Sequence, residues 1–380
     1  MIEPQEPTQA PAAETPATSE PYLTSGDMPA GSATELRGTR WLRDGRTWLA
    51  LAFICCVIGV GTWLSLEQEK LKQSAYRASV QGLADTYALE LSRQLRVAVS
   101  TTLSVGALAA AEGPGLTAES FKTIADSLLN FYVGISELQF SPYGVVEFVQ
   151  PDSDENTQPG LSLFHHPLLR DGARATIRAF PDTIAALAGP QLLVGNEVGI
   201  LIRHPVFTSY APAVLPLNET YEDNVGRAYE PLGCASNADA AELCTFPGPE
   251  KGTNFYGFAT ALAWIDELLE PVGLDRLSGG QIFIEGVSEF DWQLRRTEGW
   301  HASINDTAGI FAHSPTTPGN ESLPDPVIAN VTVDEIGVHW TFELQPAHGW
   351  STASTAFTFQ LVLVAVFTVV GGVGLGVAVL

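Results

Sequence analysis

Few residues of this chain have the type and spacing that chemistry outside a membrane requires. Cys234 and Cys244 have nine residues between them in a Gly/Asn/Ala-rich stretch, and in an oxidising compartment we expect them to form a disulfide. The adjacent His165 and His166 are not expected to hold a metal, because neighbouring side chains of a helix or strand point in different directions. We therefore expect no metal and no cofactor.

Four Asn-X-Ser/Thr sequences are candidate glycosylation sites, and all of them fall in the central part of the chain. A eukaryotic secretory route would place glycans there. The asparagines are Asn218, Asn305, Asn320 and Asn330.

The sequence motifs of common catalytic centres are absent. The chain contains no GxSxG, no HExxH and no GxxxxGK[ST] sequence. We therefore expect no enzymatic activity in this chain. An ectoenzyme whose catalytic set is not recognisable from spacing remains an alternative.

Two long uncharged apolar stretches set the context for these residues. We predict transmembrane helices at 47–66 and 353–380, since each stretch is long enough to cross the hydrocarbon core of a bilayer. Residues 1–46 form a Pro/Glu/Thr/Ala-rich tail that is predicted to be disordered. Four arginines precede the first span and place this tail in the cytosol and the central loop outside: Arg37, Arg40, Arg43 and Arg46.

The charge of the chain agrees with that topology. It carries 43 acidic and 19 basic residues, a net charge of −24, which argues against a nucleic-acid partner and suits a solvated outer surface. The expected location is the plasma membrane, with the loop extracellular.

The loop is predicted to be α+β. Residues 67–112 form a stalk helix whose apolar positions recur every three or four residues, and this stripe would pack on its own domain or on a second copy in a homodimer. The stripe is Tyr76, Val80, Leu83, Tyr87, Leu91, Leu95, Val99 and Leu103. A second helix begins after Thr117 as its cap.

Strands follow these helices. Hairpins are predicted with turns at Tyr143-Gly144 and Gly195-Asn196, and a helix at 166–179 lies between them. Further strands are expected at 254–264, 281–287, 300–304 and 338–344, with a helix from Ile265 and turn-rich segments between the strands.

Four segments in this order resemble the CHASE domain, the extracytoplasmic sensor module of cytokinin receptors and of many bacterial and protist receptors. They are GISELQFSPYGVVEFVQP, GLSLFHHPLLRDGARATIRA, LAGPQLLVGNEVGILIRHPVF and FYGFATALAWIDELLEPVGLDRL, and the resemblance covers 101–287. It implies two tandem PAS-like units, a distal one at about 117–264 and a proximal one at about 265–346. It also implies a cytoplasmic histidine kinase or nucleotide or diguanylate cyclase beyond this chain, which we expect to be the N-terminal part of a larger receptor.

The resemblance also implies a ligand site in the distal unit. Its carboxylate position falls at Asp171, its aliphatic position at Leu193 or Val194, and its threonine position at Arg203. A guanidinium there would pair with Asp171 or hold an anionic ligand, and either disfavours a neutral purine. Phe140 and Phe148 are candidates for ligand stacking, although the pattern favours the core for both.

These observations predict a small-molecule sensor that signals across a membrane. A glycosylated adhesion or scaffold ectodomain without a small ligand is the main alternative.

Overall fold

The computed structural model describes residues 45–152, 159–166, 169–192, 198–212, 221–222, 228–229, 245–296, 309–317, 321–350 and five single residues between 362 and 369. The chain divides into two compact units, Met1–Val60 with Ala365–Leu380 and Gly61–Val364. Residues 1–44 of the tail, Leu193, Val194, Cys234, Cys244, Asn218, Asn305 and Asn320 lie outside the described residues, so the disulfide and the glycosylation stay predictions. Gly45 and Arg46, which were predicted to be disordered, begin a helix.

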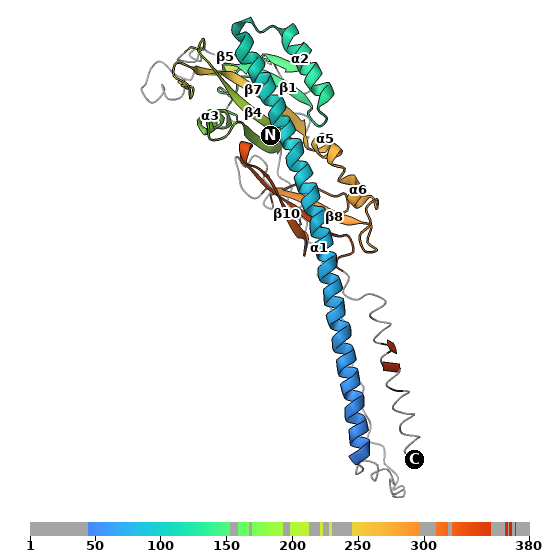
Figure 1. The fold of residues 1–380 in the computed structure, drawn as a ribbon. Helices are drawn as coiled ribbons and strands as arrows, with labels where there is room; N and C mark the ends of the chain where they lie inside the picture. The colour runs from blue at the N-terminus through green and yellow to red at the C-terminus, as the bar shows by residue number, and fades with distance from the viewer. Residues whose placement is uncertain are drawn as a thin grey trace, which may run out of the picture. The chain divides into compact units, whose positions relative to one another are not determined.

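Helix α1 (Gly45–Glu112) is the longest element. No proline interrupts it, and it ends where Gly113 takes a φ of +56°. Within the second unit, the predicted apolar stripe is buried, and one hydrophobic core joins it to residues of both main sheets (Figure 1). The stripe therefore packs on its own domain, and dimerisation through the stalk stays a prediction.

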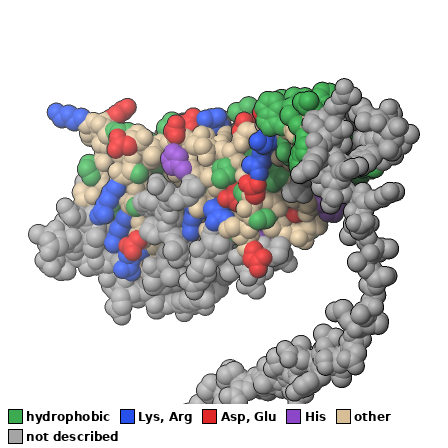
Figure 2. Space-filling view, turned by 90° about the horizontal axis from the view of Figure 1, so that it is seen from below, with side chains coloured by type: hydrophobic (Ala, Val, Ile, Leu, Met, Phe, Trp, Pro, Cys, Tyr) green, Lys and Arg blue, Asp and Glu red, His purple; other side chains and the backbone are tan. Residues whose placement is uncertain are grey.

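One helix among the described residues, α1, passes the length and composition test for a membrane span. Its first part carries large apolar side chains that are exposed in this chain: Trp48, Leu49, Phe53, Val57, Val60, Trp63, Leu64 and Leu66. Figure 2 shows a continuous hydrophobic area beside surface on which acidic and basic side chains are interspersed. Most of 353–380 lies outside the described residues, so a two-span topology stays a prediction.

Helix α2 (Ala118–Phe131) begins as predicted. The Thr117 side chain accepts a hydrogen bond from the Ser120 backbone N–H, and the Ser120 hydroxyl closes the capping box.

A five-stranded antiparallel sheet follows, in the order β2-β1-β7-β4-β3. Its strands are β1 (Glu137–Pro142), β2 (Phe148–Gln150), β3 (Ala186–Leu192), β4 (Val198–Thr208) and β7 (Asn254–Trp264). Both predicted hairpins are present as antiparallel pairs. The β1–β2 turn needs Gly144, which has a φ of +80° and on which a Cβ would lie 2.4 Å from the Phe164 ring.

Shorter elements surround this sheet. Helix α3 spans Arg170–Ala179, a few residues shorter than predicted, and β5 (Tyr221–Glu222) pairs with β6 (Ala228–Tyr229). The chain then forms α5 (Ile265–Leu269) and α6 (Asp275–Ser278), and the first of these is the helix expected after β7. Three-residue helices lie at η2 (Gly113–Gly115), η3 (Glu270–Val272) and η4 (Asp334–Ile336).

A four-stranded antiparallel sheet, β10-β11-β8-β9, completes the unit. Its strands are β8 (Phe290–Arg296), β9 (Ile310–His313), β10 (Val327–Val333) and β11 (Val338–Pro346). The predicted α+β class, with a long helix followed by antiparallel sheets, is confirmed.

The expected strand at 281–287 is wrong. Glu285 and Gly286 both take positive φ, at 48° and 90°, and the chain turns back on itself there through one bridge between Ile284 and Val287. A strand needs extended backbone at every residue, so the strand of this region begins later, at Phe290.

Candidate functional site

The two faces of the five-stranded sheet differ in chemistry. On β4, Ile200, Ile202 and Val206 belong to the core that contains α1. Side chains alternate along a strand, so Leu201 and Arg203 lie on the opposite face. The candidate site is on that second face.

A row of polar residues crosses the middle of this face. Arg203 lies opposite Thr260 on β7, and Thr260 lies opposite Gln139 on β1. Directly paired residues of antiparallel strands share a face, so Glu137 and Ser141 of β1 lie there too. All five side chains are buried, each with at most 8% of its surface exposed. Gln139 Nε2 donates to Glu137 Oε1 at 2.5 Å. Any buried polar group of the row that lacks a hydrogen-bond partner costs stability.

Arg203 is the most exceptional member of the row. It is 3% exposed, its Nε is buried, and no described residue pairs with it by hydrogen bond or salt bridge. It lies over the ring of Phe258, whose centroid is 5.5 Å from the guanidinium carbon. Burial lowers the pKa of Arg203 to about 10, with no carboxylate to offset it.

The hydroxyls beside Arg203 are also unused. Thr260 Oγ1 and Ser141 Oγ are buried and have no hydrogen-bond partner among the described residues. Three unpaired polar groups on neighbouring strands offer a set of donors and acceptors that suits a small polar ligand.

Helix α3 covers this face. Its Ala173 and Ile177 share a hydrophobic cluster with Phe258 of β7 and Phe164. Arg174 on the same helix is half-buried, and its Nε and Nη2 have no partner among the described residues. Its pKa is lowered mainly by burial and next by the neighbouring Arg170. Helix α3, which covers the site, therefore adds positive charge to it.

The structure places Asp171 away from Arg203. Asp171 is exposed in the first turn of α3, where its carboxylate raises the pKa of Arg174. Burial lowers the pKa of Arg203, and Asp171 does not contribute to that shift. The alternative in which Asp171 neutralises Arg203 is thus not realised, and the guanidinium stays available to an anion.

Phe140 and Phe148 lie on the other face of the sheet. Phe140 is fully buried in the core with α1, and its ring is 6.3 Å from that of Phe148 and 5.5 Å from that of Tyr256. Phe148 packs on Phe121 of α2. The structure does not bring these rings together with Arg203.

Sequence reasoning missed Thr260, Ser141, Gln139 and Arg174. The alternation in ELQFSP did contain a signal, because every second residue from Glu137 is polar, but that pattern ordinarily indicates a solvent face. Thr260 was visible as the one polar residue in a run of small and aromatic ones, GFATALAW.

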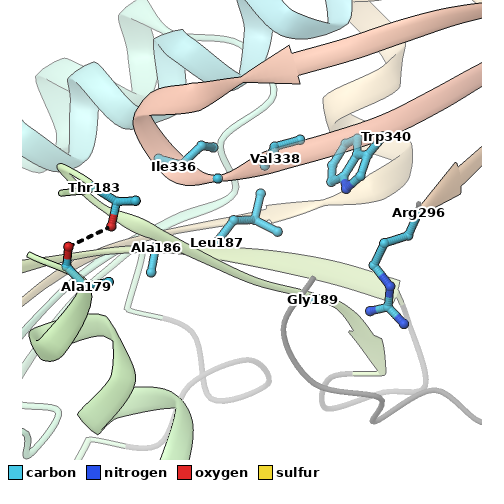
Figure 3. A pocket seen from close by; sticks show the side chains of 10 residues that line it. Ala179, Thr183, Ala186, Leu187, Gly189, Arg296, Ile336, Val338 and Trp340 are labelled. Atoms are coloured by element: carbon cyan, nitrogen blue, oxygen red, sulfur yellow. Dashed lines mark hydrogen bonds between the residues drawn. The ribbon is translucent and has the colours of Figure 1, made fainter. Parts of the chain in front are cut away.

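A small cavity lies beside the outer strand of this sheet (Figure 3). It measures about 110 Å³ and is lined from β3 by Ala186, Leu187 and Gly189 and from β11 by Val338 and Trp340. Its volume suits a few water molecules rather than a metabolite. No group of three or more metal-ligating side chains occurs among the described residues.

No protein-family model matches the chain, and no curated protein does. Among solved structures, an extracellular ligand-binding receptor from Desulfohalobium retbaense DSM5692 matches with a TM-score of 0.38 and 12% identity over 69% of this chain, which spans 39% of that protein.

Two ligand-binding domains of Pseudomonas aeruginosa PAO1 amino acid chemoreceptors match over 70% of this chain. PctC in complex with GABA has a TM-score of 0.40 and 9% identity over 98% of its length, and PctB in complex with L-Arg has 0.39 and 10% over 93%. The similar structures are thus ligand-binding receptor domains, at similarities too low to assign this chain to their family or to the CHASE family.

Proposed function

We propose that this chain is the sensor module of a membrane receptor and that a small anionic molecule binds on the Arg203 face of the five-stranded sheet. The observation that carries the proposal is Arg203, a guanidinium that is 3% exposed and unpaired among the described residues. An isolated buried charge is unfavourable, and an incoming anion removes that cost.

The geometry favours a carboxylate or a group of similar shape. A planar guanidinium donates two parallel hydrogen bonds to such a group. The Thr260 and Ser141 hydroxyls lie on the same sheet face and donate or accept as the ligand demands. Amino acids carry a carboxylate of this shape, so they belong among the first compounds to test.

The wider receptor is proposed on the sequence. Spans at 47–66 and 353–380 hold an extracellular CHASE-like loop with a Cys234–Cys244 disulfide and glycans. The signal passes to a cytoplasmic histidine kinase or cyclase, and the stalk helix pairs two copies. We also propose that the chain itself catalyses no reaction.

A contact close to the second predicted span supports transmission. The indole Nε1 of Trp350 donates to the Asp325 carbonyl at 2.6 Å, and the Arg77 guanidinium of α1 lies 4.6 Å from the Trp350 ring centroid. Tyr76 packs edge-on against the same ring at 5.4 Å. A shift of α1 would therefore change the contacts of Trp350, which precedes the predicted span at 353–380.

The test is a thermal-shift titration of the full chain in neutral maltoside micelles. The panel contains amino acids, 2-oxo acids, dicarboxylates and phosphate esters. A ligand at a hundred times its Kd stabilises the fold by about 2.7 kcal/mol, which is readily measured. We expect at least one anion to stabilise the wild type, and Arg203→Met to lose that response.

Arg178→Met is the matched control, because Arg178 is an exposed arginine on α3 and its loss should leave the response unchanged. The proposal is contradicted if the active anion stabilises Arg203→Met as strongly as the wild type. It also fails if the entire panel is silent while a partner protein binds, which would favour the scaffold alternative.

A further inference from the structure

A second pocket lies where the end of β7 and the start of α5 meet β8 and β9, and Val198 at the start of β4 also lines it. It has a volume of about 600 Å³, within the range of small-molecule sites. The described residues that line it are mainly aromatic and acidic, and the argument uses Trp264, Asp266, Glu267, Trp292, Phe311 and His313.

Three aromatic side chains form the walls. Trp264 and Trp292 are 8% and 6% exposed, so both rings are held by packing. Trp292 lies 6.4 Å from Phe342, and the Phe311 ring packs edge-on against Trp340 at 4.8 Å. Rings fixed in this way offer preformed π faces, which attract cations and above all alkylammonium groups.

The formal charge of the lining is negative. Asp266 and Glu267 both border the pocket, and no lysine or arginine does among the residues described there. One oxygen of Glu267 accepts a hydrogen bond from Ser136 Oγ at 2.6 Å, and Ser136 Oγ accepts from the Trp264 backbone N–H at 3.0 Å. This chain of bonds ties one Glu267 oxygen to the backbone of Trp264 through the Ser136 hydroxyl.

One residue of this lining carries an unused hydrogen-bond donor. Trp292 Nε1 is buried and has no partner among the described residues. A buried indole N–H ordinarily finds an acceptor, so its ligand should carry an oxygen as well as a positive charge.

We propose that this pocket binds an organic cation of the choline type, an alkylammonium group with an oxygen acceptor a few atoms away. The aromatic rings and the two carboxylates hold the ammonium group, and Trp292 Nε1 donates to the oxygen. The residues that line it differ from those of the proposed anion site at Arg203, so a receptor of this kind would respond to two ligands of opposite charge.

The test is isothermal titration of the full chain in maltoside micelles with choline, tetramethylammonium and 3,3-dimethylbutanol, the uncharged isostere of choline. We expect choline to bind, tetramethylammonium to bind less tightly because it lacks the oxygen, and the isostere to bind at least about tenfold more weakly than choline. The result that overturns the proposal is an isostere as tight as choline, or no heat from choline at tens of millimolar.

Two variants locate the ligand without threatening the fold. Phe311→Leu keeps an apolar side chain but removes the π face, and Asp266→Asn alters an exposed side chain; each should raise the choline Kd by about five- to tenfold. Arg178→Met is the control, because Arg178 is exposed on α3, and it should bind choline like the wild type. Unchanged choline affinity in both pocket variants would place the binding elsewhere and reject this site.

Discussion

Replacing Arg203 by methionine should stabilise the ligand-free protein, although arginine removal from a protein interior ordinarily destabilises it. Burial lowers the pKa of Arg203 to about 10, and this shift corresponds to a penalty of roughly 3 kcal/mol for holding the charge in the folded state. Contact with the Phe258 ring at 5.5 Å returns about 1 kcal/mol of this. The net gain on substitution is therefore about 2 kcal/mol.

The pH of the measurement matters little within the ordinary range. A base whose folded pKa is depressed destabilises the fold at every pH below that folded value, and the penalty disappears only as the pH rises from about 10 toward 12.5. At pH 7 the full effect is present. For a domain of this size, about 2 kcal/mol corresponds to a rise in Tm of roughly 5 °C.

The assay is thermal unfolding of the full chain without ligand, followed by tryptophan fluorescence. Arg295→Met provides the contrast, because Arg295 Nε lies 3.1 Å from Glu343 Oε1 and that carboxylate is 7% exposed. Breaking this pair should lower the Tm, since it strands a buried charge. If Arg203→Met also lowers the Tm by several degrees, Arg203 has a partner in the folded protein and the argument for an empty anion site is refuted.

Three further predictions follow from the described residues. Gly106→Ala should destabilise the fold by about 1–3 kcal/mol, because its Cβ would lie 2.8 Å from His204 Cδ2, whereas Gly82→Ala in open space should be neutral or stabilising in the same denaturation series. Burial lowers the pKa of His204, so stability should fall as the pH drops below about 6.5, and His204→Gln should flatten that dependence in urea titrations. Asn330 is exposed on the outer strand β10, so a secreted eukaryotic preparation should lose mass on the gel after Asn330→Gln; an unchanged mobility would show that this site carries no glycan.

Local pattern was enough to predict the elements that local interactions decide. The Thr117 cap, the β1–β2 hairpin at Gly144 and the helix after Trp264 each depend on residues within a few positions of one another. The prediction of a strand at 281–287 was wrong because interactions beyond the local sequence decide the backbone there. The apolar residues of this segment fit a strand, but the positive φ of Glu285 and Gly286 is a property of the fold.

The strands β9 and β10 were overlooked for different reasons. β9 has four residues, too few for a period to be read. β10, VIANVTV, alternates clearly, and its burial alternates with it, but the prolines and the glycosylation sequences around it favoured a turn-rich interpretation. Its pairing with β11 is a long-range contact that no local pattern contains.

The candidate anion site shows where sequence reasoning ends. Whether Arg203 faces α1 or the opposite side depends on strand register, and a shift of one residue exchanges the two faces. The burial of the polar residues in ELQFSP could not be predicted either. A strand with a polar residue at every second position has the same sequence pattern whether water or α3 covers that face. Only the assembled sheet shows that these polar residues are buried, and burial turns an ordinary pattern into a binding hypothesis.

The opposite charges of the two proposed sites make them separable by experiment. The Arg203 face of the five-stranded sheet carries the Arg203 guanidinium and lies under the half-buried Arg174. The second pocket is lined by Asp266 and Glu267 together with aromatic rings. A carboxylate is repelled by the second and a quaternary ammonium by the first, so neither ligand is expected to exchange between sites. A compound that binds the wild type but binds neither Arg203→Met nor Asp266→Asn would therefore have to contact both sites. Only a zwitterion longer than the distance between the two sites satisfies that condition.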